Sequence, residues 1–439
     1  MIKKLLFLIF NPFFVSYYYR FCVKKIKELP ADTQLFFITR RDFGTYPQLL
    51  NYIACWEEKR GKTALVFLTG RFDIIESLVR LICPATHLIG PDNSLACKAI
   101  AYFHPRTIHL QSFARVYARL AIDYEEALYL YNQASTYPPP SHNSSYQVYF
   151  DHYLKELGKF ATPAFKKAYI EVRKLIDYRE DVYNDQLDVA SQQRDLTPLH
   201  QRIKPLLEDL KNKLCLQGPY VVININCKDY THQHPDANRK KIAFPERYNA
   251  IIDFLINKGF VVVIQGRDEQ PVFQSRHGLI DYAKSPYVSP ENDVALYAGS
   301  TFAILCKTGP EYFAMLADIP ILGLNYVELC CMVPSTKLRF FPKNLKKKGR
   351  SFSWQQLLQE ACYFDLGKSN FDHEVIYEDL SEEDMLTAVE EFLPLVQNNS
   401  WLDLTPLQKA YKESLNPLHL DQYRVLSVPC DVYLRRKCE

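Results

Sequence analysis

The stretch 299–326, GSTFAILCKTGPEYFAMLADIPILGLNY, decides the fold. Apolar runs at 302–306 and 319–324 predict two strands, and the segment 311–317 between them predicts a helix. Proline has a fixed φ and lacks an N–H, so Pro310 suits the first position of that helix. A strand, a turn, a helix and a second strand in this order form one unit of a parallel α/β sheet.

The turn at 307–310 predicts an anion-binding site. The free N–H groups and positive dipole end of the following helix face the carboxyl edge of the sheet. Lys307 adds a cation, Thr308 a hydroxyl and cap, and Gly309 a close backbone approach. Glu311 can accept hydrogen bonds from a ribose or sugar hydroxyl, or serve as a first-turn acid stabilised by the dipole. The same residues also suit a buried crossover with a conventional cap and no ligand.

Composition narrows the function classes. A chain of 439 residues predicts two domains, and 48% hydrophobic with 23% charged residues is typical of a globular protein. A net charge of +3 does not indicate a nucleic-acid partner. The twelve cysteines include no C-x-x-C pair, which predicts reduced thiols in the cytoplasm rather than disulfides or a zinc site.

The first domain, 27–197, is predicted to be Rossmann-like with helical additions. Strands are expected at 35–39, 63–69 and 86–90, and helices at 46–61 and 73–83. This alternation indicates a doubly wound parallel sheet, in which the loop after the first strand faces a ligand cleft. That loop carries Arg40, Arg41 and Asp42, but it has too few glycines for a P-loop or dinucleotide fingerprint.

The second domain, 198–400, repeats the pattern. Helices are expected at 199–214, 244–258, 353–361 and 382–396, and further strands at 220–226 and 260–266, with Gly259 as a C′ glycine. The chain from 325 to 349 is expected to be rich in loops. The tail, 401–439, is expected to pack back on the first domain.

Several pieces of the second domain carry a family resemblance. The run KTGPEYFAMLADIPILGL resembles the Thr-Gly-Pro turn of lipopolysaccharide heptosyltransferases and other GT-B glycosyltransferases. Residues 219–360 are similar to a family of bacterial glycosyltransferases linked to surface polysaccharides. The matching pieces are NRKKIAFPERYNAIIDFLINKGFVVVIQG, IDYAKSP, the Thr-Gly-Pro turn, Asn325, Pro342-Lys343 and GRSFSWQQLL.

The resemblance implies a GT-B-like fold of two Rossmann-type domains facing a cleft, which binds a nucleotide-diphosphate sugar as co-substrate and needs no cofactor or metal. The residues expected to bind the donor are Lys228, Asn238, Arg239, Gly266, Arg267, Lys307, Thr308, Gly309 and Glu311. Arg267 replaces an arginine that relatives carry where this chain has Gln265. Lys307 stands where heptosyltransferases have an acid, which leaves the sugar preference open.

On the acceptor side, Asp42 lies where heptosyltransferase-like enzymes carry a loop aspartate, and Arg40 and Arg41 could hold a charged acceptor. Asp42 could equally cap the next helix or pair with either arginine. A group of histidines and aspartates follows the predicted strand at 220–226: Asp229, His232, His234 and Asp236. Such side chains can bind a metal ion, but their spacing is not that of a standard zinc site.

The sequence therefore predicts a cytoplasmic glycosyltransferase that acts on a glycan or glycolipid in surface-polysaccharide or lipopolysaccharide synthesis. Two alternatives stay open: a nucleotide-sugar epimerase and a non-catalytic nucleotide-sugar-binding protein. The N-terminal segment, 1–26, is apolar, aromatic and too short to span a bilayer. It suits an interfacial helix peripheral to the inner membrane, a packed helix or a secretory signal.

Overall fold

The structure, a computed structural model, describes part of the chain. The described residues are 24, 27–29, 34–38, 50, 53–54, 64–68, 72–84, 87–89, 107–109, 195–226, 243–266, 273–306, 309–326, 335–347, 349–359, 375–414 and 427–437. They divide between two compact units, and those from Leu196 onward belong to the second. The N-terminal segment up to residue 23, with its predicted membrane contact, lies outside the described residues.

The first unit contains a parallel sheet in the order β3-β2-β1-β4. Its elements are β1 (Gln34–Ile38), β2 (Ala64–Leu68), α3 (Phe72–Ile82), β3 (His87–Ile89) and β4 (Thr107–His109). α3 buries Leu78, Val79 and Ile82, as expected of an amphipathic helix on a sheet. The predicted parallel α/β arrangement is confirmed here, and β4 is a strand that the sequence analysis does not expect.

The second unit is built on a seven-stranded parallel sheet in the order β14-β10-β9-β8-β5-β6-β7. Its strands are β5 (Tyr220–Asn224), β6 (Val261–Ile264), β7 (Leu279–Asp281), β8 (Phe302–Leu305), β9 (Ile321–Tyr326), β10 (Leu338–Pro342) and β14 (Val428–Pro429). β5, β8 and β9 are buried along their whole length. Such continuous apolar strands are typical of a parallel sheet covered on both faces.

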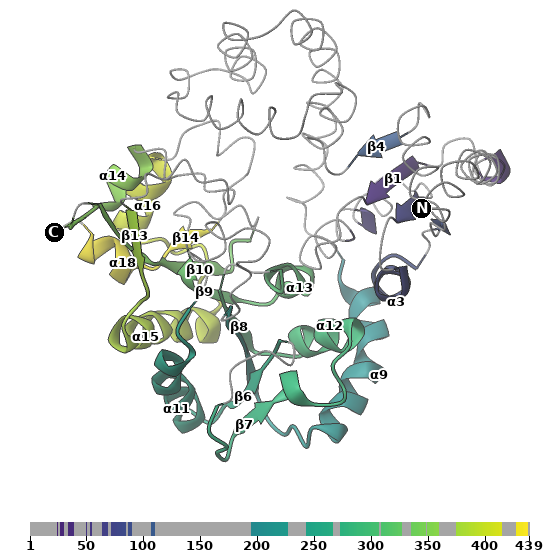
Figure 1. Ribbon diagram of the computed structural model, residues 1–439, viewed down its shortest axis with the longest axis horizontal. Coiled ribbons are helices and arrows are strands. Elements are labelled where there is room, and N and C mark those ends of the chain that lie inside the picture. Colours follow the sequence, from purple (N-terminus) through teal and green to yellow (C-terminus); the bar gives the residue numbers. More distant parts are fainter. Residues whose placement is uncertain are drawn as a thin grey trace, which may run out of the picture. The chain divides into compact units, whose positions relative to one another are not determined.

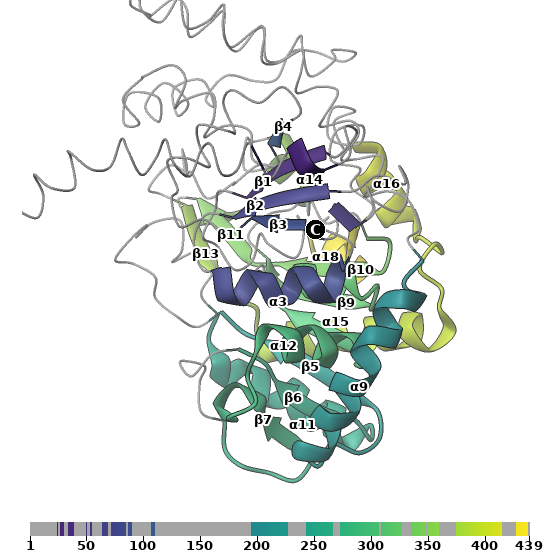
Figure 2. The same cartoon turned by 90° about the vertical axis from the view of Figure 1, so that its right-hand side faces the viewer.

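Helices cover both faces of this sheet (Figure 1). On one side α9 (Thr197–Lys213) packs against α12 (Pro290–Ala298), as Figure 2 also shows, and α12 contacts α13 (Glu311–Leu316). On the other side α11 (Asn249–Asn257), preceded by the short helix η1 (Pro245–Tyr248), packs against α15 (Glu382–Asn398). Aromatic pairs fill both layers: Tyr297 stacks on Phe313, and Phe302 meets Phe392 edge to face.

Local signals position these helices. Ser289 caps α12, and Ser381 forms a capping box with Asp384 at the start of α15. Gly259 has φ +87° just after α11, which confirms the expected C′ glycine. Pro310 precedes α13 with helical angles of φ −52° and ψ −23°, one position earlier than the sequence analysis places it.

The prediction that the chain from 325 to 349 is rich in loops is wrong, because this stretch contains strands. β10 joins the main sheet, and β11 (Asn344–Lys347) pairs antiparallel with β12 (Arg350–Ser351) and β13 (Val375–Glu378). The charged residues in this stretch hide the pattern. Arg339 lies inside β10 and is nevertheless buried, with its guanidinium donating to the carbonyls of Thr336, Leu338 and Trp401.

The described part of the C-terminal segment belongs to the second unit, and its predicted packing on the first domain stays a prediction. β14 pairs with β10, and α16 (Pro406–Ser414) and α18 (Asp431–Arg436) pack beside it. Glu391 of α15 accepts the N–H groups of Asp431 and Val432 at the start of α18. The tail therefore supplies an edge strand and two helices to this unit.

Candidate functional site

The second sheet has a topological switch point between β5 and β8. The chain runs outward from β5 to β6 and β7, then returns to the other side of β5 and continues through β8, β9 and β10. Connections after β5 and β8 therefore leave in opposite directions at the carboxyl edge. In open α/β sheets this is where ligands bind.

The first sheet has the same feature between β1 and β4. From β1 the chain runs to β2 and β3, and then returns to β4 on the other side of β1. The predicted acceptor residues Arg40, Arg41 and Asp42 follow directly after β1, which ends at Ile38. They lie outside the described residues, so their role stays a prediction.

The predicted donor residues follow three neighbouring strands of the second sheet. In chain order, Lys228, Asn238 and Arg239 follow β5, Gly266 and Arg267 follow β6, and Lys307, Thr308, Gly309 and Glu311 follow β8. β5 lies between β6 and β8, so all three loops begin at adjacent points on one edge. Of these residues Gly266, Gly309 and Glu311 are described; the others lie outside the described residues.

Backbone hydrogen bonds hold the described residues of the turn after β8. The N–H of Tyr312 donates to the carbonyl of Gly309 at 3.1 Å, and the N–H of Phe313 to that of Pro310 at 3.0 Å. Glu311 is fully buried in the first turn of α13. Gly266 is also buried, immediately beyond β6.

Gln265 has a structural role in this edge. Its carboxamide oxygen accepts from Asn224 Nδ2 at 2.8 Å and from the Tyr297 hydroxyl at 3.0 Å. These bonds join the ends of β5 and β6 to α12. Because the Gln265 side chain is buried and used in this way, the structure accounts for a glutamine where relatives are expected to carry arginine.

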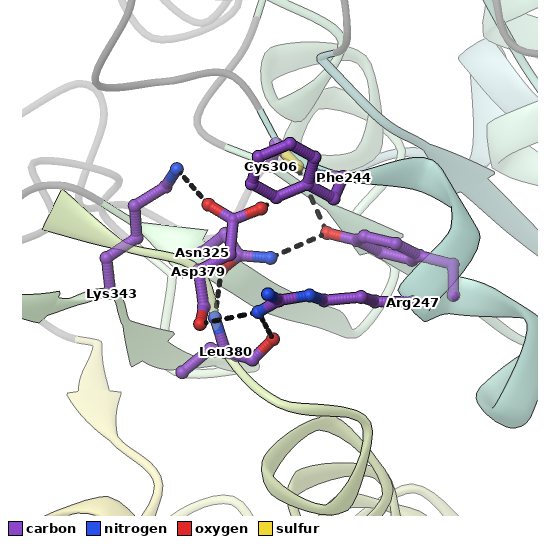
Figure 3. A network of polar contacts seen from close by, with 8 residues as sticks. Phe244, Arg247, Cys306, Asn325, Lys343, Asp379 and Leu380 are labelled. Atoms are coloured by element: carbon purple, nitrogen blue, oxygen red, sulfur yellow. Dashed lines mark hydrogen bonds and ion pairs between the residues drawn. The ribbon is translucent and has the colours of Figure 1, made fainter.

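A second polar network lies where β8, β9 and β10 end (Figure 3). The Asp379 carboxylate forms an ion pair with Lys343 Nζ, and these side chains are only 3% and 2% exposed. Its other oxygen accepts the N–H of Phe244 at 2.7 Å. Asp379 thus ties the end of β10 to the residue that starts η1, and a buried carboxylate needs such partners.

Arg247 and Asn325 extend the network. Arg247 Nη1 donates to the carbonyls of Asp379 and Leu380, both at 2.9 Å. Asn325, in a left-handed conformation with φ +58°, accepts the Leu380 N–H at 2.8 Å and donates to the Tyr248 hydroxyl at 3.2 Å. The segment before α15 is therefore fixed from several directions (Figure 3).

Tyr248 links this network to the β8 turn. Its hydroxyl lies 3.3 Å from Cys306 Sγ, and Cys306 is the first residue after β8. Burial raises the pKa of Tyr248 well above its ordinary value, and burial also raises the pKa of the Cys306 thiol. In both cases burial favours the neutral form of the group.

The network also fixes the base of the loop that follows β5. The N–H of Ala243 donates to the carbonyl of Asn226 at 2.8 Å, and the next residue, Phe244, is held by Asp379. Asn226 and Ala243, the described residues on either side of 227–242, therefore lie together beside the switch point. Asp379 was missed by the sequence analysis, since it belongs to no local motif. Arg247, Asn325 and Lys343 lie in pieces that the resemblance marked, but no role was predicted for them.

Metal-type ligands do not gather in the part of the chain that the structure describes, where no group of three or more His, Cys, Asp or Glu side chains is placed to hold an ion. Asp229, His232, His234 and Asp236 lie outside that part. Among the described helices, none is long and apolar enough to cross a membrane.

No family model matches the chain, and no curated protein sequence does. Similar solved structures include E. coli ADP-heptose lps heptosyltransferase II, at 11% identity and a TM-score of 0.42, covering 84% of this chain and 100% of that one. A glycosyl transferase family 9 structure from Veillonella parvula is 12% identical, with a TM-score of 0.39, and the match covers 83% of this chain and 98% of that one. The UDP-GlcNAc 2-epimerase from Methanocaldococcus jannaschii is 10% identical, with a TM-score of 0.35, and the match covers 82% of this chain and 92% of that one.

Proposed function

We propose that the chain is a GT-B-like glycosyltransferase, which moves a sugar from a nucleotide-diphosphate sugar to a glycan or glycolipid in surface-polysaccharide or lipopolysaccharide synthesis. The observation that carries the proposal is the topology of the second sheet. The three loops that bear the expected donor-binding residues all begin at the carboxyl edge, around the β5–β8 switch point.

On the donor side, the diphosphate is the group that these loops suit. Lys228, Arg239, Arg267 and Lys307 supply cations, and Thr308 and Gly309 supply a hydroxyl and a close backbone approach. An arginine can bind a diphosphate through two hydrogen bonds, and fixed donors stabilise the charge that develops on the leaving group. In this proposal the four cations stabilise the charge on the leaving diphosphate, so no metal ion is needed for that step.

On the acceptor side, the base comes from the first unit. Asp42 would accept the proton of the acceptor hydroxyl, while Arg40 and Arg41 would hold a charged acceptor. Their loop follows β1, whose carboxyl end forms the switch point of the first sheet. We further propose that the enzyme works in the cytoplasm and that residues 1–20 bind the membrane interface peripherally. Deleting them should then lower the membrane-bound fraction.

The donor site is tested by thermal shift against nucleoside diphosphates and nucleotide sugars. A ligand that binds only the folded state raises the melting temperature, so one nucleotide family should stabilise the protein. Thr308→Val and Arg267→Ala should lose the shift, whereas Lys213→Ala, which removes an exposed cation from α9, should keep it. No shift with any nucleotide would leave the turn as a helix cap and refute the donor site.

The chemistry is tested separately with Asp42→Asn. The variant should bind the nucleotide sugar as the wild type does but lose transfer to an acceptor. Full turnover by Asp42→Asn would remove this residue from the mechanism. Interconversion of sugar epimers without an acceptor would instead identify an epimerase, and binding with neither reaction would identify a non-catalytic protein.

A further inference from the structure

Phe244 is an exposed aromatic residue immediately before η1. Its neighbours Ala243 and Tyr248 are buried, yet Phe244 is 52% exposed. Among the described residues the other large exposed hydrophobic side chains are Ile376 and Leu402, both aliphatic. A single exposed hydrophobic side chain is common on protein surfaces; what distinguishes Phe244 is the cation over its ring and its place at the carboxyl edge.

The backbone of Phe244 is fixed, and a cation lies over its ring. The backbone N–H of Phe244 donates to the buried Asp379 carboxylate at 2.7 Å, and Pro245 restricts the backbone that follows. The Arg247 guanidinium lies over the ring, 5.4 Å from its centroid, and is itself fixed by two backbone carbonyls. A preorganised ring binds a ligand at a lower entropic cost than a mobile one.

The ring lies at the carboxyl edge where the donor site is proposed. Phe244 follows Ala243, whose N–H donates to the carbonyl of Asn226 just beyond the end of β5. Tyr248, one turn further along, contacts Cys306 directly. Phe244 therefore lies at the carboxyl edge, near the end of β5.

We propose that Phe244 is the stacking platform for the nucleobase of the nucleotide-diphosphate sugar. This inference rests on the proposed function and adds the residue that binds the base. Stacking on an aromatic face is tolerant of base identity, because every base has a π-face. Phe244 thus contributes affinity, and the choice among bases comes from other contacts.

The experiment compares nucleoside diphosphates with inorganic pyrophosphate by calorimetry, in the full-length wild type and in Phe244→Ala, Phe244→Leu and Phe244→Trp. The wild type should bind one diphosphate more tightly than pyrophosphate. Phe244→Ala and Phe244→Leu should lower the affinity for that diphosphate about tenfold. They should leave the affinity for pyrophosphate within twofold of the wild-type value, since only the base stacks. Phe244→Trp should retain the affinity, and Leu402→Ala, at a 79% exposed aliphatic side chain, should change nothing.

The outcomes separate this inference from the function on which it rests. The platform is refuted and the donor site stands if Phe244→Ala and Phe244→Leu bind the diphosphate as the wild type does. The same holds if these variants lose as much affinity for pyrophosphate as for the diphosphate. If the wild type binds neither ligand, the donor site itself is refuted and the platform with it. The leucine variant keeps the apolar bulk, so the comparison holds even where the alanine variant folds poorly.

Discussion

Asp379 shows how much of the second unit depends on single buried charges. Its carboxylate faces the Lys343 ammonium and also accepts the Phe244 N–H, with hardly any exposure to solvent. We expect Asp379→Asn to destabilise the fold by about 3–5 kcal/mol, because it removes the negative charge beside a buried ammonium. Chemical denaturation measures this difference.

The neighbouring residue provides a matched control. Glu378 pairs with Lys346, but these side chains are 43% and 37% exposed. Glu378→Gln should therefore cost less than about 1 kcal/mol. Equal losses in the two variants would mean that burial of the Lys343–Asp379 pair has no special effect.

Glu391 should make stability depend on pH. Burial raises its pKa above the ordinary glutamate value, although the N–H groups of Val432 and Asp431 oppose that shift. A folded-state pKa above the unfolded one means that the folded state holds the proton more tightly. The free energy of unfolding should then fall as pH rises from the ordinary glutamate pKa through the raised pKa.

Denaturation of wild type and Glu391→Gln across this pH range isolates the effect, because the glutamine does not titrate. The stability of the wild type relative to the variant should decrease with rising pH. A difference that is constant with pH, or that increases, would contradict the raised pKa.

Residue-level prediction from sequence succeeded where a rule is local. Gly259 is fixed by the need for a left-handed residue after a helix, and that requirement is visible in the sequence. Asp379 was not predictable, since its partners Lys343 and Phe244 lie 36 and 135 residues away. Pairing over such separations depends on the sheet order, which local patterns do not specify.

At the scale of elements, the end of β9 is the most constrained. Asn325 has a left-handed backbone, and the pairing of β9 with β10 shifts register between Phe341 and Pro342. The Tyr326 ring lies over Gly323, so a Cβ at 323 would lie 1.5 Å from ring carbon Cε2. Tyr326 is completely buried and packs edge to face on Phe340.

We therefore expect Gly323→Ala to displace Tyr326 and lower stability by about 1–3 kcal/mol, as overpacking in cores does. A double-mutant cycle with Tyr326→Ala tests the cause. With the ring removed, Gly323→Ala should cost much less than in the wild type. Additive losses would place the effect elsewhere in β9.

The long elements were predictable, and so were some short ones, but the short strands β4 and β14 were not. The predicted segments at 199–214, 220–226 and 382–396 correspond to α9, β5 and α15 because their apolar periodicity is sustained. β4 and β14 have only three and two residues, too few to show a period. β10 was hidden by Arg339, a buried charge that only its carbonyl partners make compatible with a core strand.

At the scale of the whole molecule, each unit has its own parallel sheet with its own switch point. The alternation of strands and helices predicted the parallel sheets, and the resemblance named the residues beyond their carboxyl edges. The structure adds the strand order, which brings the loops after β5, β6 and β8 to adjacent points. The sequence alone could not give that order, because it depends on which strands pair.

The central claim is that the carboxyl edge around β5 and β8 binds a nucleotide-diphosphate sugar. Hydrogen exchange followed by mass spectrometry, with and without saturating nucleoside diphosphate or nucleotide sugar, tests it most directly. We predict slower exchange in peptides that cover 220–248 and 302–316, and unchanged exchange in peptides from α15 to α18. Protection confined to the α15–α18 region, or none at all within 220–316, would contradict the account.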